Sequence, residues 1–219
     1  MAVILALETA TTNCSVAVVN SEGKVFLKED YGSKYSHGEK LHVYIAEILQ
    51  EAGLSHKDLD AVAVSQGPGS YTGLRIGVSA AKGLCFAQDI PLITIGTLDS
   101  LVRQLKSTEG YLVAMLDARR MEAYTAVYDN QYQTLEAVKP EILDEESFKK
   151  YLDAAKVQFI GTANEKFKEI CDHPNAVFVN DRLPSAQELI PLALQKFKAS
   201  DFADLAYFEP QYLKAFQPG

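Results

Sequence analysis

The chain has 219 residues and a formal charge of −8, from 21 basic and 29 acidic side chains, so it lacks the basic footprint of a protein that holds nucleic acid unaided. Its content of 47% hydrophobic and 23% charged residues is typical of globular proteins and excludes the disordered and fibrous classes. Three separated cysteines without a CxxC pair, and no apolar run near the length of a membrane span, predict a cytoplasmic protein without membrane contact.

The first half of the chain alternates between strand and helix patterns. Apolar runs ended by an acid or by turn residues predict strands, and apolar residues at helical spacing predict amphipathic helices. In chain order the predicted elements are strands over 2–7, 14–19 and 25–31, a helix over 37–52, a strand over 61–64, a helix over 70–86 that Ser70 caps, a strand over 91–95 and a helix over 97–106.

The second half begins by repeating the first. At a constant offset of 109 residues, Val3–Glu8 aligns without gaps on Leu112–Asp117, and 16–20 aligns on 125–129. Matching acids and matching turns in one register indicate an internal duplication. The remaining predicted elements are a strand ending at 142, a helix over 144–155, a strand over 157–160, a helix over 162–171, a strand over 176–179 and a helix over 185–198.

Four segments resemble the bacterial TsaB (YeaZ) family. They are Ile4–Thr9, Ser36–Leu41, Gly67–Gly77 and Asp117–Tyr124, of which the glycine-containing Gly67–Gly77 is the most specific. The repeated pattern also resembles the actin/Hsp70-like ATPase superfamily. The resemblance implies an α/β fold of two duplicated ribonuclease-H-like lobes with mixed sheets. We expect an N-terminal lobe over 1–106 that carries partner-binding helices, and a C-terminal lobe over 107–219.

The same resemblance implies a noncatalytic dimerisation subunit. It would act with TsaD and TsaE in transferring a threonylcarbamoyl group to adenosine in tRNA, and it would reach tRNA through the complex. TsaD would be its partner in a heterodimer, and a second copy would replace TsaD when TsaD is absent. This chain would need no cofactor, whereas the complex uses ATP. The alternative is an active small ATPase or sugar-kinase-like enzyme of the same superfamily.

The turns that would bind nucleotide depart from what an ATPase needs. Such an enzyme holds phosphate with the amides of glycine-rich turns and places magnesium with acids. Ala10 stands where the first turn usually has glycine, and the second turn, over 117–121, has none. We therefore expect no catalytic residue in this chain. Weak nucleotide binding or a role in a cleft wall stays open for Glu8, Thr9, Thr11, Asp117, Arg119 and Arg120, and the alternative for the acids is that they cap turns.

The histidines do not favour a metal site. His37 and His42 are the closest pair, and five helical steps place them roughly 140° apart around a helix. They cannot share one ion, so we expect no metal and no metallopeptidase chemistry.

Two helices carry the pattern expected of a partner interface. Gly73, Gly77 and Ala81 recur every four residues, and each interior glycine costs about 1 kcal/mol relative to alanine. That cost indicates close approach of another backbone, which belongs either to a partner or to the protein's own sheet. We expect the interface with TsaD or a second copy to include His37, Glu39, Leu41, Tyr44, Ile45, Ile48, Ser70, Gly73, Leu74, Arg75, Gly77 and Ala81.

Overall fold

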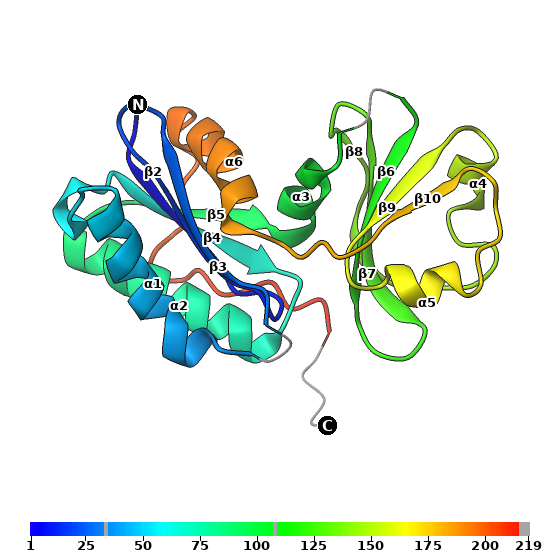
Figure 1. The fold of residues 1–219 in the computed structure, drawn as a ribbon, viewed down its shortest axis with the longest axis horizontal. Coiled ribbons are helices and arrows are strands. Elements are labelled where there is room, and N and C mark those ends of the chain that lie inside the picture. Colours follow the sequence, from blue (N-terminus) through cyan, green and yellow to red (C-terminus); the bar gives the residue numbers. More distant parts are fainter. Residues whose placement is uncertain (33–34, 107–108, 215–219) are drawn as a thin grey trace. The chain divides into compact units, whose positions relative to one another are not determined.

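A computed structural model describes residues 1–32, 35–106 and 109–214, and the chain forms two compact units. The first unit contains Met1–Ser100 and Pro184–Tyr212. The second unit contains Leu101–Leu183 and the residues from Leu213. Each unit is built around one five-stranded sheet (Figure 1). No helix in the described part of the chain is both long enough and apolar enough to cross a bilayer.

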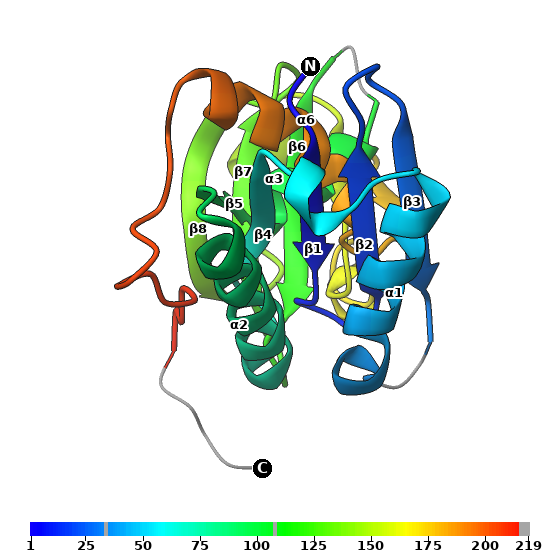
Figure 2. The ribbon, with the colours of Figure 1, turned by 90° about the vertical axis from the view of Figure 1, so that its left-hand side faces the viewer.

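The first unit has a mixed sheet in the order β3-β2-β1-β4-β5. Its strands are β1 Ile4–Glu8, β2 Cys14–Val19, β3 Val25–Asp30, β4 Ala61–Gly67 and β5 Leu92–Gly96. The strands β1, β2 and β3 form the predicted antiparallel meander, and β4 and β5 continue the sheet in parallel with β1. Helices α1 (His37–Glu51) and α2 (Tyr71–Gln88) lie side by side on one face of this sheet (Figure 2).

The second unit repeats the same strand order. Its sheet runs β8-β7-β6-β9-β10, with β6 and β7 antiparallel and β9 and β10 parallel to β6. The bounds are β6 Tyr111–Asp117, β7 Glu122–Asp129, β8 Thr134–Ile142, β9 Val157–Ile160 and β10 Ala176–Val179. The predicted duplication and the α/β class with two ribonuclease-H-like mixed sheets are therefore confirmed.

Side-chain alternation along the central strands gives the first sheet two different faces. Leu5, Leu7, Val62 and Val64 are fully buried beneath α1 and α2. The residues that alternate with these on β1 and β4 point to the other face of the sheet. Most of them are alanines, and they face α6 (Ala186–Lys198). Because a strand buried on both faces needs apolar residues at every position, β1 and β4 read as continuous apolar runs.

The place of α6 corrects the expected division at residue 106. We expected 185–198 in the C-terminal lobe, but residues 184–212 belong to the first unit. Ala186, Leu189, Ile190 and Ala193 form a stripe at helical spacing that packs against the small side chains of the first sheet. The alanines allow the helix to lie close to the strands, so this helix completes the N-terminal core.

Three helices are shorter than predicted. The segment over 97–106 forms α3 (Thr97–Leu101) and a 3-10 turn, 144–155 contains α4 (Lys149–Leu152), and 162–171 contains α5 (Asn164–Lys168). Before α4, Asp144 N–H donates to the Ser147 hydroxyl at 3.0 Å, and the Asp144 carboxylate accepts from Glu146 N–H at 3.0 Å. Such local side-chain bonds satisfy backbone groups outside a helix, so the helix starts later.

The packing of α6 predicts the effect of enlarging Ala63, which is fully buried on the α6 face of β4. Ala63→Leu should lower the free energy of unfolding by about 1–3 kcal/mol, because the added methyl groups must displace α6. Urea unfolding measures this change. The exposed Ala154 is the control, and Ala154→Leu should change stability by less than about 0.5 kcal/mol. Equal effects at the two positions would contradict the assignment of α6 to this core.

Candidate functional site

The end of β1 fixes the position of α2. Thr9 follows β1, is fully buried, and its hydroxyl donates to the carbonyl oxygen of Gly73 at 2.8 Å. A Cβ atom at Gly73 would overlap the Thr9 carbonyl oxygen, and one at Gly77 would overlap the Thr9 hydroxyl. The two glycines therefore let the helix approach the protein's own strand end. Ser70 caps the helix as predicted, since its hydroxyl accepts from Gly73 N–H at 3.2 Å.

The outward side of α2 forms one wall of a surface groove. Its exposed residues are Thr72, Arg75, Ser79, Gly83, Phe86 and Ala87, and the first five recur at intervals of three or four. The groove has a volume of about 650 Å³, and His42 of α1 also contributes to it. The lining residues are His42, Tyr71, Thr72, Arg75, Ile76, Ser79, Ala80, Gly83 and Leu84.

Large apolar side chains are exposed on the same two helices. Phe86 on α2 is 82% exposed, and Val43 on α1 is 50% exposed. A Cβ at Gly83 would meet no atom within 4 Å, so the helix surface is open there. An apolar groove next to exposed aromatic and aliphatic side chains is typical of a protein-interaction surface.

A cation is held at the edge of the groove. The Arg75 guanidinium lies 4.0 Å from the centre of the Tyr71 ring, and its Nε donates to the Tyr212 hydroxyl at 3.2 Å. Tyr212 comes from the chain end, which is anchored where Gln211 N–H donates to the Gln66 carbonyl oxygen at 2.7 Å. Arg75 forms no ion pair with any acid in the described ranges.

Most of the residues expected at the partner interface face the protein's own core. The buried ones are His37, Leu41, Ile45, Ile48, Gly73, Leu74, Gly77 and Ala81. Among the expected residues, Glu39 and Arg75 are exposed, and Tyr44 and Ser70 are partly exposed. Gly73 and Gly77 contact Thr9, so the structure supports the second of the two alternatives given for the repeat, close approach to the protein's own sheet.

The groove also contains residues that the sequence analysis did not select, namely His42, Tyr71, Thr72, Ile76, Ser79, Ala80, Gly83 and Leu84. The signal for them was Gly83, an interior helix glycine with no packing neighbour of its own. It lies six residues beyond Gly77, about 120° away in orientation, so it points to a different side of α2.

Glu8 occupies a buried polar pocket at the end of β1. One carboxylate oxygen accepts from Ala10 N–H at 2.7 Å and from the Ser65 hydroxyl at 2.8 Å. The other oxygen is buried without a hydrogen-bond partner. Burial raises the pKa of Glu8 to about 7, and the nearby Glu188 acts in the same direction, while the hydrogen bonds partly oppose them.

The other residues considered for nucleotide binding lie in different settings. Thr11 is buried, and its carbonyl oxygen accepts from His37 Nε2 at 2.7 Å. In the second unit Asp117, Arg119 and Arg120 lie in the exposed turn that joins β6 and β7. Nucleotide binding by these residues stays a prediction.

The two histidines that lie near each other in sequence have different environments. His37 is buried and bonded to Thr11, and burial lowers its pKa, whereas His42 is exposed in the groove. No cluster of three or more His, Cys, Asp or Glu side chains in the described part of the chain could hold a metal ion.

The contact of Thr9 with α2 predicts a specific coupling. Gly77→Ala should destabilise the protein by about 1–2 kcal/mol, because its Cβ meets the Thr9 hydroxyl. In a Thr9→Ala background that oxygen is gone, so the same Gly77→Ala change should cost about zero or become stabilising through helix propensity. Urea unfolding of the four variants measures the coupling. Gly83→Ala is the control and should stabilise the protein by up to about 1 kcal/mol. If the effects of Thr9→Ala and Gly77→Ala on the free energy of unfolding are additive, the contact between Thr9 and Gly77 is contradicted.

Glu8 predicts a pH dependence of stability. The unfolded chain loses this proton near pH 4.5, whereas the folded protein keeps it until about pH 7. Stability therefore falls as pH rises through this window, by up to about 3 kcal/mol from this group alone. Glu8→Gln keeps the acceptor for Ala10 and Ser65 and removes the titration. Chemical unfolding between pH 4.5 and 8 should show a shallower decline for the variant, and identical profiles would contradict the raised pKa.

Comparisons with known proteins identify the family. The family model described as "TsaD: tRNA N6-adenosine threonylcarbamoyltransferase" matches residues 32–216. The Escherichia coli (strain K12) "tRNA threonylcarbamoyladenosine biosynthesis protein TsaB" is 31% identical, with 96% of this chain and 94% of that protein covered. The structure titled "YeaZ from Pseudomonas aeruginosa" is 28% identical with a TM-score of 0.83, covering 97% of this chain and 100% of that one. A second structure, of a Pseudomonas aeruginosa protein with similarity to peptidase YeaZ, has a TM-score of 0.86 at 26% identity and covers 98% of this chain and 100% of that chain. The chain therefore belongs to the TsaB (YeaZ) family of tRNA threonylcarbamoyladenosine biosynthesis proteins.

Proposed function

We propose that this chain is a noncatalytic subunit that binds a TsaD-type protein and thereby supports transfer of threonylcarbamoyl to adenosine in tRNA. The groove that α2 forms with His42 of α1 is the observation that carries the proposal, because most of its surface is apolar. Its role is structural: docking covers Phe86, Val43 and the groove, and holds the partner in its active form.

The family comparison supports the choice of TsaD as the occupant. The TsaD family model matches residues 32–216, a range that includes both α1 and α2. A partner with the same fold has two equivalent helices to offer, so a pseudo-twofold pairing would form a four-helix contact. A second copy of this chain is the occupant in the absence of TsaD, because a surface that pairs with its own fold is self-complementary.

The charge of the groove adds a requirement on the partner. Arg75 is exposed, is held by Tyr71 and Tyr212, and has no acidic neighbour among the described side chains. A partner carboxylate at this position would gain a charge-assisted pair with a side chain that is already ordered. This is the contact that would favour TsaD over a second copy.

The strand-end acid Glu8 supports a noncatalytic role. Glu8 is buried and its pKa is raised to about 7, so it is only partly ionised near neutral pH, which weakens it as a magnesium ligand. The chain itself then needs no cofactor, while ATP is used by the complex through TsaE and its partners. The tRNA is held by the complex in the cytoplasm. The rival function is a small ATPase or sugar-kinase-like enzyme, which predicts ATP turnover by the purified chain alone.

Gly83 provides the sharpest test of the groove. It is exposed with open space around its Cβ position, so Gly83→Trp should fold normally and block docking. Co-purification with TsaD should fall at least tenfold, and threonylcarbamoyladenosine formation by the reconstituted proteins should fall with it. Ala154→Trp, at an exposed position of the second unit, is the control and should leave both unchanged.

Several results would overturn this assignment. Full TsaD binding by the Gly83→Trp variant, with the unfolding midpoint unchanged, would exclude the groove as the docking surface. ATP hydrolysis by the isolated chain, abolished by Glu8→Gln, would support the enzyme alternative.

A further inference from the structure

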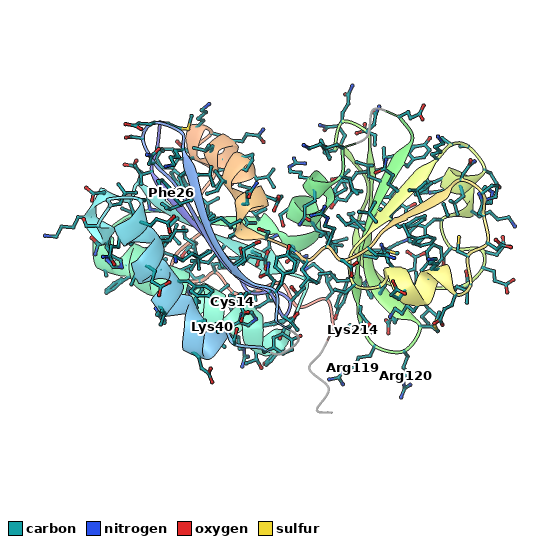
Figure 3. All side chains as sticks on the ribbon, viewed as in Figure 1. Cys14, Phe26, Lys40, Arg119, Arg120 and Lys214 are labelled. Carbon is teal, nitrogen blue, oxygen red and sulfur yellow. The ribbon has the colours of Figure 1, made fainter. Side chains whose placement is uncertain are left out.

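The turn between β6 and β7 carries two adjacent arginines that the groove does not use. Arg119 and Arg120 are both exposed, and their side chains extend away from the sheet of the second unit (Figure 3). Within residues 1–32, 35–106 and 109–214, neither guanidinium is paired with a carboxylate.

The acids that flank this turn are already neutralised. Lys166 Nζ lies 3.0 Å from the Asp117 carboxylate, and the Lys214 ammonium pairs with the carboxylate of Glu122. The arginines are therefore a local surplus of two positive charges on a chain whose formal charge is −8. Two positive charges without a carboxylate partner in the chain favour the binding of an anion from outside it.

The backbone holds the two arginines at the tip of the turn. Arg119 and Arg120 have φ values of 73° and 49°, a left-handed conformation that is strained at residues with a Cβ. Lys166 Nζ offsets this by donating to the carbonyl oxygens of Arg120 at 2.9 Å and Glu122 at 2.5 Å. Arg119 N–H also donates to the Asp117 carboxylate at 2.6 Å. The arginines are thus presented by an ordered turn.

The surroundings of the turn favour a phosphate ligand over a protein. A protein interface normally has an apolar centre inside a polar rim. The exposed apolar side chain in this turn is Met121, at 36% exposure. Guanidinium groups match phosphate oxygens with paired N–H donors, and two neighbouring arginines can serve two phosphates of one strand.

We propose that Arg119 and Arg120 bind phosphodiester groups of an RNA strand. The choice of RNA rests on the proposed function in tRNA modification, since a free nucleotide offers the same phosphate chemistry. The contact is local, because the acidic remainder of the chain repels RNA. It positions the nucleic acid and contributes no base specificity.

The test compares tRNA binding by wild-type protein and by the Arg119→Gln/Arg120→Gln variant. Fluorescence anisotropy with labelled tRNA is measured over a range of salt, on the chain alone and on the chain purified with TsaD. The variant should bind about tenfold more weakly, and its slope of log affinity against log salt should shrink by about 1.5. The Arg119→Lys/Arg120→Lys variant keeps the charge and should recover most of the affinity.

A matched control separates the effect of the two arginines in the turn from the effect of a lower net positive charge. Lys57→Gln/Lys168→Gln removes two exposed positive charges elsewhere, so it should leave the affinity within about twofold of wild type and the slope nearly unchanged. A second titration with ATP distinguishes the two sources of phosphate. ATP binding that the Arg119→Gln/Arg120→Gln variant loses, with tRNA binding intact, would reassign the site to free nucleotide.

Two other outcomes would overturn the proposal. Equal tRNA affinity and an equal salt slope for the wild-type and Arg119→Gln/Arg120→Gln proteins would contradict the proposed RNA contact. Loss of TsaD or TsaE binding in the variant, without a change in tRNA binding, would make the turn a protein contact. If wild-type protein fails to bind TsaD, the proposed function fails, while the titration of the chain alone still tests the arginines.

Discussion

The close contact between Thr9 and α2 determines what the first unit can present to a partner. The Thr9 hydroxyl bonds to the Gly73 carbonyl oxygen, and both Gly73 and Gly77 lie too near Thr9 to carry a side chain. This contact sets the rotation of α2 about its axis. One side of the helix therefore packs against the sheet. The opposite side, which carries Arg75, Gly83 and Phe86, faces outward.

The same strand end carries three of the residues considered for nucleotide binding, and all three are buried. Glu8 is enclosed with Ser65 and Ala10, and its burial favours the neutral acid. Thr9 is used for helix packing and Thr11 for holding His37. The hydrogen bonds that these residues make in the structure all lie within the first unit.

The two duplicated sheets share one topology but have different surroundings. In the first unit α1, α2 and α6 cover the two faces, and a groove is left on the outer side of α2. In the second unit the corresponding strand end is an exposed turn whose acids are paired with Lys166 and Lys214. The equivalent acids Glu8 and Asp117 therefore differ in burial. A shared fold positions both, and local packing decides what each can bind.

Alternation, capping and apolar runs are local patterns, so the α/β class, the duplication, nearly all strands and the Ser70 cap could be predicted from the amino-acid sequence. The sequence also singled out α1 and α2 as candidate partner-binding helices, α2 by its glycine repeat. The tertiary structure alone decided which side of α2 faces outward and that α6 joins the first unit. Helical spacing shows that residues share a stripe, but it carries no information on what that stripe contacts. Contacts such as Thr9 with Gly77, or Ala63 with α6, join segments far apart in the chain, so they follow only from the folded arrangement.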